Sequence, residues 1–132
     1  NAEDSSICTL DYEGCVEVGT MLGCASVIVM DHKADIVKQV RRMVDFYAHE
    51  SCGQCTQCRE GSAWTARILR RIEEGQGTEE DLDTLMEMTQ QMVGTTICVL
   101  SDSVAAPVQS SIKKFKDDYL ALIRGGERVG AA

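Results

Sequence analysis

The chain has 132 residues, of which 44% are hydrophobic and 26% are charged, and its formal net charge is −8. This length suits about one domain with a modest core. The acidic balance disfavours nonspecific binding of nucleic acid, which depends on a basic surface. No apolar run approaches the length of a membrane span, so direct membrane insertion is not expected. The acidic start "NAEDSSICTL" also lacks the basic residues and apolar core of a signal peptide.

Residues 1–30 are predicted to be β-rich. Glycines at positions 14, 19 and 23 precede "ASVIVM" (25–30), a β-branched run that is typical of a buried strand. We expect this piece to be too small to fold alone and to form the end of a domain whose beginning lies elsewhere.

Residues 31–132 favour four amphipathic helices, because apolar residues recur there at helical spacing. The third helix is predicted to begin at Thr78, which has Asp81 three residues on, an arrangement resembling a capping box. Pro107 is expected in the first turn of the fourth helix, and "GGERVG" (125–130) is interpreted as a tail. The apolar stripes run from Ile36 to Tyr47, Trp64 to Ile72, Leu82 to Val93 and Val108 to Leu122. Short connections between such helices predict an antiparallel four-helix bundle, giving a mainly α chain.

Seven cysteines are unusually many for this length, and their odd number would leave one thiol outside a purely disulfide-linked framework. Without an export signal, a reducing compartment is expected, where clustered cysteines indicate metal binding or catalysis. Cys8, Cys15 and Cys24 show no ligand spacing, so we interpret them as small hydrophobic residues.

The stretch "ESCGQCTQCREG" (50–61) places Cys52, Cys55 and Cys58 at intervals of three. A fourth ligand is needed to complete a tetrahedral set, and Cys98 follows Cys58 after two predicted helices. A chain that runs up one helix and down the next returns to the level it left. The loop that holds Cys98 can therefore face the loop that holds the other three.

Three interpretations of these thiols compete. Structural zinc sites usually take their ligands as two separated pairs, whereas here three ligands are clustered and one is remote. The compact C-x2-C-x2-C run is the cysteine spacing of bacterial ferredoxins and differs from the C-x4-C-x2-C spacing of plant-type [2Fe–2S] proteins. It therefore favours a [4Fe–4S] cluster over a [2Fe–2S] cluster. Zinc, and disulfides or inert thiols, remain as alternatives.

Two residues beside the motif carry charge. His49 could in principle bind a metal, but with four cysteines available it is interpreted as a helix-end residue. Arg59 directly follows the third cysteine. Because a thiolate-bound cluster is anionic, we expect Arg59 to donate toward it and raise its reduction potential.

The stretches "FYAHESCGQCTQCREG" and "TICVLSDSVAAPVQSSIKKFKDDY" closely resemble the C-terminal part of the NADH-binding flavoprotein subunit of respiratory complex I. Related diaphorase subunits of NAD-linked hydrogenases and formate dehydrogenases carry similar stretches. "GTMLGCASVIVMD" is similar to the segment that closes the ubiquitin-like β-grasp domain of that subunit. The resemblance covers residues 10 to about 124 and is specific, because the motif, the remote cysteine and the flanking helices agree.

Some positions depart from the family's usual pattern. Val99 and Ser101 stand where "T-I-C-A-L-G-D" has alanine and glycine, and Ala106 replaces a tryptophan. Gln57 replaces the proline of "C-T-P-C", which frees the loop but removes no ligand.

The resemblance implies that Cys52, Cys55, Cys58 and Cys98 hold a [4Fe–4S] cluster in a helical bundle, residues 31–132, preceded by the end of a β-grasp domain, residues 1–30. The implied function is electron transfer, from reduced flavin of an NADH dehydrogenase or diaphorase module to a further iron–sulfur cluster.

The resemblance also implies which cofactors and partners lie outside this chain. FMN and NADH are expected only on a missing or separate domain, so this chain alone should not catalyse the oxidation of NADH. The implied partners are a flavin- and NADH-binding domain or subunit and a neighbouring iron–sulfur subunit. The implied location is a soluble peripheral arm, in the bacterial cytoplasm or on the mitochondrial matrix side. The alternative function is a zinc-stapled helical interaction module without a redox role.

Overall fold

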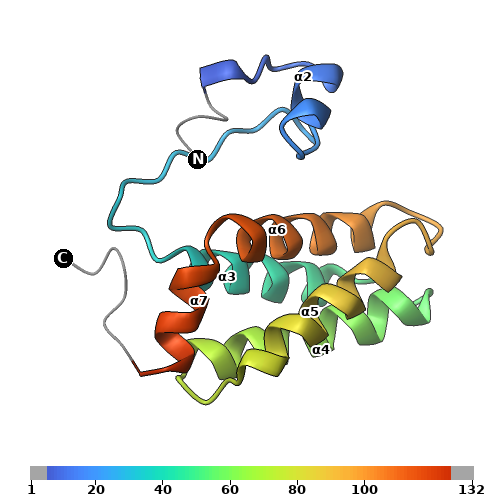
Figure 1. Ribbon diagram of the computed structural model, residues 1–132. Helices are drawn as coiled ribbons and strands as arrows, with labels where there is room; N and C mark the ends of the chain where they lie inside the picture. Colours follow the sequence, from blue (N-terminus) through green and yellow to red (C-terminus); the bar gives the residue numbers. More distant parts are fainter. Residues whose placement is uncertain (1–5, 126–132) are drawn as a thin grey trace. The chain divides into compact units, whose positions relative to one another are not determined.

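The computed structural model describes residues 6–125 (Figure 1). The chain divides into two compact units, one ending at Asp31 and the other beginning at His32. The predicted tail at 125–130 lies outside the described residues except for Gly125.

The first unit contains the short helix α2, Tyr12–Glu17. Asp11 caps its start, because the Oδ1 atom of this residue accepts a hydrogen bond from the backbone N–H of Gly14 at 2.7 Å. The remainder of the unit, from Val18 to Asp31, has turns and irregular backbone.

The predicted strand at 25–30 does not form, and residues 6–125 contain no strand at all. A strand is stable only when its backbone groups pair with a neighbouring strand, and the described residues offer no such neighbour. Val27, Ile28 and Val29 are accordingly 69%, 70% and 89% exposed. The prediction of a β-rich piece was therefore wrong for these residues as they stand, whereas the prediction of a mainly helical chain is confirmed.

The second unit is built from five helices that follow one another with short connections. Helices α4 and α6 pack against each other and against both α3 and α5, and α7 packs against α3, α4 and α6. Figure 1 shows that the α3–α4 and α5–α6 connections lie at one end of this unit and α7 at the other. The helices are α3 (Ile36–Glu50), α4 (Thr56–Glu73), α5 (Glu79–Met92), α6 (Leu100–Lys114) and α7 (Lys116–Ile123).

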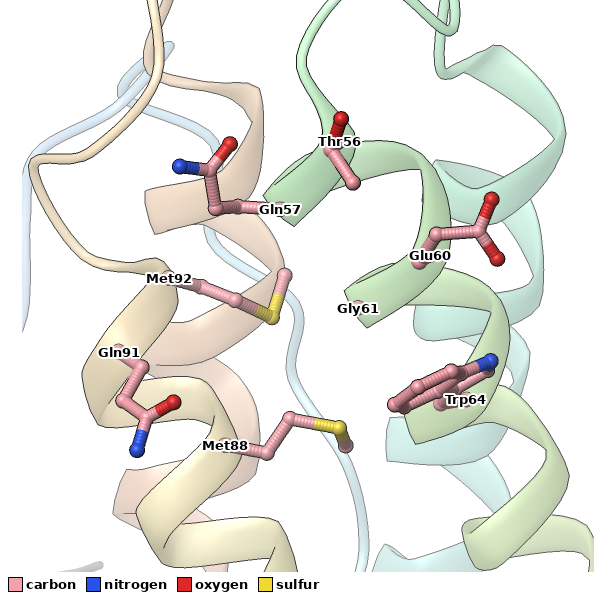
Figure 2. Close-up of a pocket in the computed structure, with 8 residues that line it drawn as sticks. All are labelled: Thr56, Gln57, Glu60, Gly61, Trp64, Met88, Gln91 and Met92. Carbon is pink, nitrogen blue, oxygen red and sulfur yellow. The ribbon is translucent and has the colours of Figure 1, made fainter.

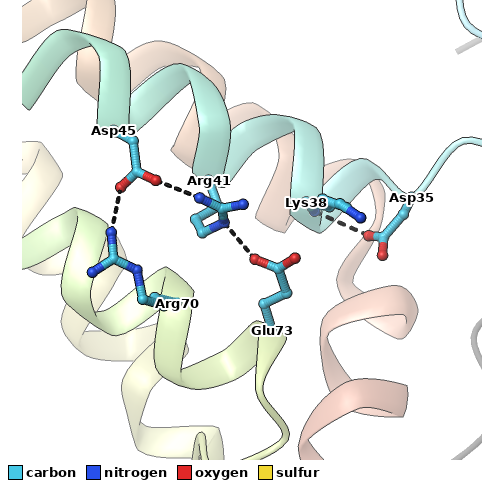
Figure 3. Close-up of polar contacts among 6 residues, drawn as sticks. All are labelled: Asp35, Lys38, Arg41, Asp45, Arg70 and Glu73. Atoms are coloured by element: carbon cyan, nitrogen blue, oxygen red, sulfur yellow. Dashed lines mark hydrogen bonds and ion pairs between the residues drawn. The ribbon is translucent and has the colours of Figure 1, made fainter.

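Side-chain caps explain where two of these helices begin. The Oδ1 atom of Asp35 accepts from the N–H of Lys38 at 3.0 Å at the start of α3 (Figure 3). At the start of α5, Oδ2 of Asp81 accepts from the N–H of Thr78 at 2.8 Å, as the sequence predicted for this pair.

The fourth predicted helix begins earlier than expected and is divided in two. Pro107 lies inside α6 rather than in its first turn, and the helical run breaks at Phe115 before α7 starts. The break lets α7 turn toward the core, where the hydroxyl groups of Tyr119 and Ser111 lie 2.8 Å apart in a hydrogen bond. Because Tyr119 is fully buried, this bond satisfies a hydroxyl that would otherwise be costly to bury.

Apolar faces from all five helices meet in one core. The α3–α4 contact is reinforced at its edge by an ion-pair network in which Arg41 binds both Asp45 and Glu73, while Arg70 binds Asp45 at 3.1 Å (Figure 3). The core residues include Val37, Val40, Val44, Leu69, Ile72, Leu82, Leu85, Met92, Val104, Val108, Ile112, Tyr119 and Leu122. Burial of these side chains fixes the register of the helices and hence the position of the loops at their ends.

Candidate metal centre

The three clustered cysteines lie where α3 leads into α4. Cys52 is exposed in the connecting loop, Cys55 is the N-cap residue of α4, and Cys58 lies in the first turn of α4 with 7% of its surface exposed. Sγ of Cys58 is 3.3 Å from Oγ of Ser51. The predicted loop therefore holds Cys52, whereas Cys55 stands at the start of α4 and Cys58 lies within this helix.

Backbone geometry and Arg59 shape this loop. Gly53 has φ of +79°, a left-handed conformation that glycine adopts without strain. Its carbonyl oxygen accepts a hydrogen bond of 3.1 Å from Nη1 of Arg59, whose Nε also donates to Glu60 at 2.9 Å. Arg59 thus folds back across the turn between Cys52 and Cys55 and places a positive charge beside it.

Cys98 lies in the connection between α5 and α6, two residues before the start of α6, and it is exposed. Its carbonyl oxygen accepts from Oγ1 of Thr96 at 2.8 Å. Ser101, which is fully buried, contacts Oγ1 of Thr96 at 2.6 Å and donates to the carbonyl oxygen of Met92 at 3.0 Å. The serine that departs from the usual family pattern therefore ties the Cys98 loop to the end of α5.

A helix–helix contact brings the two cysteine loops to the same end of the unit. A Cβ atom built on Gly61, in the second turn of α4, would lie only 2.6 Å from Sδ of Met92, the last residue of α5. The start of α4 and the end of α5 are therefore in direct contact, and Ser101 in turn holds the start of α6 onto Met92. This shared end is the one predicted from the sequence, in which two helices separate Cys58 from Cys98.

The donor set at this end fits a soft, anionic metal centre. Cys55 and Cys98 stand at the entrances of α4 and α6, and neither helix has a side-chain hydrogen bond capping its N-terminus. The positive ends of these two helix dipoles therefore lie at the cysteine positions, where a negatively charged group is stabilised.

In the structure the four predicted ligands do not surround one common point at metal-binding distance. Within residues 6–125, no three Cys, His, Asp or Glu side chains gather closely enough to hold a metal ion. The loops share an end of the unit, but the ligand set Cys52, Cys55, Cys58 and Cys98 stays a prediction. His49 lies in the last turn of α3 with an 86% exposed side chain, as expected for a helix-end residue.

Beside the motif is an apolar groove that sequence reasoning missed. It lies between α4 and α5, has a volume of about 410 Å³, and is lined by Thr56, Gln57, Glu60, Gly61, Trp64, Met88, Gln91 and Met92 (Figure 2). Trp64 is 52% exposed at its edge. Met92 is fully buried and Met88 packs partly against the core. The spacing of Gly61 and Trp64, which lie on one face of α4, could have indicated this groove. A glycine leaves space beside a large side chain.

Residues 38–122 match the family described as the NADH-ubiquinone oxidoreductase-F iron-sulfur binding region, a 4Fe-4S family. In Mycobacterium tuberculosis (strain ATCC 25618 / H37Rv), the F subunit of NADH-quinone oxidoreductase is 47% identical over 117 residues, covering 89% of this chain and 26% of that protein. The mitochondrial NADH-ubiquinone oxidoreductase 51 kDa subunit of Neurospora crassa is 46% identical over 126 residues, with 91% and 26% covered. The F subunit of the Rhodobacter capsulatus NADH-quinone oxidoreductase is 42% identical over 124 residues, with 92% and 29% covered.

The chain spans about a quarter of the length of these curated relatives. No helix within residues 6–125 is both long and apolar enough to cross a bilayer.

The cofactor indicated by the family is a [4Fe–4S] cluster. The clustered thiols, the shared end of the helices and the family match lead to one conclusion. The chain belongs to the 4Fe-4S binding region of the complex I flavoprotein subunit, the F or 51 kDa subunit of NADH:quinone oxidoreductase.

Proposed function

We propose that this chain is an electron relay in which Cys52, Cys55, Cys58 and Cys98 bind the [4Fe–4S] cluster. The observation that carries the proposal is the contact of Gly61 with Met92, because it brings the two cysteine loops to one end of the helical unit. When bound, such a cluster accepts one electron and passes it on. The protein supplies the ligands, their burial and the surrounding charge.

The residues around the loops have distinct roles in this proposal. Cys58 is buried and fixed beside Ser51, so it is the ligand shielded most from water. Cys52 and Cys98 are exposed on the loops before α4 and α6, so they are the ligands more open to water. Arg59, held by the carbonyl of Gly53, provides a positive charge that stabilises the more negative, reduced state.

The electron donor in this proposal is reduced FMN on a flavin- and NADH-binding domain or subunit, and the acceptor is a further iron–sulfur cluster in a neighbouring subunit. The relatives are named as NADH-quinone or NADH-ubiquinone oxidoreductase subunits, which supports this direction of flow. Hydride chemistry with NADH belongs to the flavin part, so the chain by itself does not oxidise NADH. Its location is proposed as the peripheral arm, facing the bacterial cytoplasm or the mitochondrial matrix.

We propose a domain organisation to match, with residues 1–30 as the end of a β-grasp domain and residues 31–132 as an antiparallel helical bundle that carries the cluster. The exposed run Val27–Val29 supports the first part, because three adjacent β-branched side chains without cover suit a strand that pairs with sheet residues outside this chain.

Anaerobic reduction tests the electron-relay proposal against the zinc-stapled module. We expect the anaerobically purified chain to be brown and to bleach when dithionite or photoreduced free FMN is added, with colour returning on reoxidation. A colourless chain that contains zinc and shows no visible change with either reductant would contradict the relay. In that case the four cysteines would contribute folding free energy only.

A further inference from the structure

The segment before α2 folds back onto that helix. A Cβ atom built on Gly14 would lie 2.1 Å from Oγ1 of Thr9 and 2.7 Å from its carbonyl oxygen. Only a residue without a side chain fits at this approach. The backbone at Thr9 therefore lies directly against the first turn of α2, and the neighbours of Thr9 and Gly14, which are Cys8 and Cys15, are brought together.

The thiols of Cys8 and Cys15 share one acceptor. Sγ of Cys8 lies 3.4 Å from the carbonyl oxygen of Thr9 and 3.7 Å from that of Gly14. Sγ of Cys15 lies 3.9 Å from the same oxygen of Thr9. The pair therefore differs from a lone buried cysteine, because both sulfur atoms lie beside the same carbonyl oxygen.

We propose that Cys8 and Cys15 form a thiol–disulfide modification site, separate from the cluster ligands, which a small-molecule disulfide such as oxidised glutathione converts to an intramolecular disulfide. The partly exposed thiol of Cys8 attacks first as its thiolate, forming a mixed disulfide and releasing one glutathione thiolate. The thiolate of Cys15 then attacks the sulfur of Cys8, forming the protein disulfide and releasing the second glutathione. Two protein thiols are oxidised, one glutathione disulfide is reduced to two thiols, and the two protons pass to the released thiolates.

The environment of the pair sets the order of these steps. Cys15 is 4% exposed, whereas Cys8 is partly exposed, so a bulky disulfide reaches Cys8 first. Burial, together with the neighbouring Cys8 thiol, raises the pKa of Cys15. Because only the thiolate attacks, the raised pKa makes ring closure accelerate as the pH rises above neutral.

The positions of glutamates allow the pairing to be read directly. Glu13 separates Cys8 from Cys15, and Glu17 separates Cys15 from Cys24. The whole cluster-loaded chain is equilibrated anaerobically with glutathione buffers, blocked with N-ethylmaleimide, denatured, cut with a glutamate-specific protease and analysed by mass spectrometry. We expect the peptide that contains Cys8 to be linked to the peptide of residues 14–17. The link should be lost in Cys8→Ser and Cys15→Ser and kept in the matched control Cys24→Ser.

Dilution distinguishes the intramolecular disulfide from mixed disulfides. At a fixed ratio of oxidised to reduced glutathione, diluting the buffer tenfold should raise the ratio of disulfide to dithiol about tenfold, because two glutathione thiols leave per disulfide formed. A mixed disulfide does not respond to this dilution. The proposal is overturned if Cys8 and Cys15 stay open to alkylation across the series, if Cys24 or a cluster cysteine is the linked partner, or if the modification ignores dilution.

Discussion

Met92, the last residue of α5, packs its thioether directly over the backbone of Gly61 in the second turn of α4, where a Cβ atom would approach Sδ to 2.6 Å. This contact holds the entrance of α4 against the exit of α5. Because Cys58 lies one turn before Gly61 and Cys98 a short loop after Met92, the same contact determines that both cysteine segments share one end of the helices.

Gly61→Ala should therefore destabilise the helical unit, although alanine is the better helix former. The added methyl group overpacks the contact, at a cost of about 1–3 kcal/mol, while the gain in helix propensity is about 1 kcal/mol. We expect a lower urea midpoint by circular dichroism. The double variant with Met92→Ala should lose less stability than the two single losses together. If the single losses simply add, the two residues are not in the contact described.

Cys98→Ala should abolish the cluster, because a remote ligand is lost that the 52–58 segment cannot replace. Iron and acid-labile sulfide should fall to background, and the α5–α6 loop should become more open to proteolysis. Cys24→Ala is the matched control, since Cys24 is also exposed but carries no proposed ligand role. Full iron and sulfide content in Cys98→Ala would place the fourth ligand elsewhere.

Arg59→Gln should lower the reduction potential of the cluster. Removing a positive charge near the thiols destabilises the reduced, more negative state, and a change of 1.4 kcal/mol corresponds to about 59 mV for one electron. We expect a decrease of about 20–60 mV in a redox titration followed by EPR. Arg124→Gln serves as the control, because Arg124 pairs with Glu79 at the opposite end of α5. An unchanged midpoint potential in Arg59→Gln argues that the guanidinium acts only on the loop.

Tyr119 should make stability depend on pH in the alkaline range. Burial raises the pKa of this phenol to about 12, and the hydrogen bond to Ser111 opposes part of the rise. The ordinary pKa is 10.0, so ionisation favours the unfolded chain between these values. The neutral phenol of Tyr119 therefore makes its full contribution to the free energy of unfolding below about pH 10. As the pH rises to about 12, the free energy of unfolding falls by roughly 2–3 kcal/mol.

Unfolding free energies measured from pH 9 to about pH 12 should show this loss in the wild type and less of it in Tyr119→Phe. Tyr12→Phe, which alters an exposed tyrosine, should behave as the wild type. Parallel profiles for the wild type and Tyr119→Phe would show that Tyr119 ionises in the folded chain as freely as in the unfolded one.

The sequence predicted the elements whose cause is local. The spacing of Val37, Val40 and Val44 predicted α3, and Thr78 with Asp81 predicted the start of α5. The break at Phe115 was not predicted, because it depends on Tyr119 reaching a buried partner, Ser111, in a neighbouring helix. Such a contact leaves no periodic trace in the sequence.

The strand at 25–30 failed for a related reason. A run of β-branched residues favours the extended backbone of a strand, but a strand also needs a second strand to pair with. None is present in the described part of the chain. For the candidate site, the order of helices and loops in the sequence predicted the shared end, whereas the four cysteine ligands stay a prediction. The sequence did not indicate the tether from Ser101 to Met92 or the fold of Arg59 onto Gly53, because both are contacts between a side chain and a distant or turned backbone carbonyl.

Metal and sulfide analysis of the anaerobically purified chain, combined with an EPR spectrum of the dithionite-reduced sample, tests the central claim most directly. We expect about four iron and four sulfide ions per chain, no zinc, no flavin, and a signal of about one unpaired electron per chain on reduction. About one zinc ion per chain, without iron or sulfide and without an EPR signal, would contradict it.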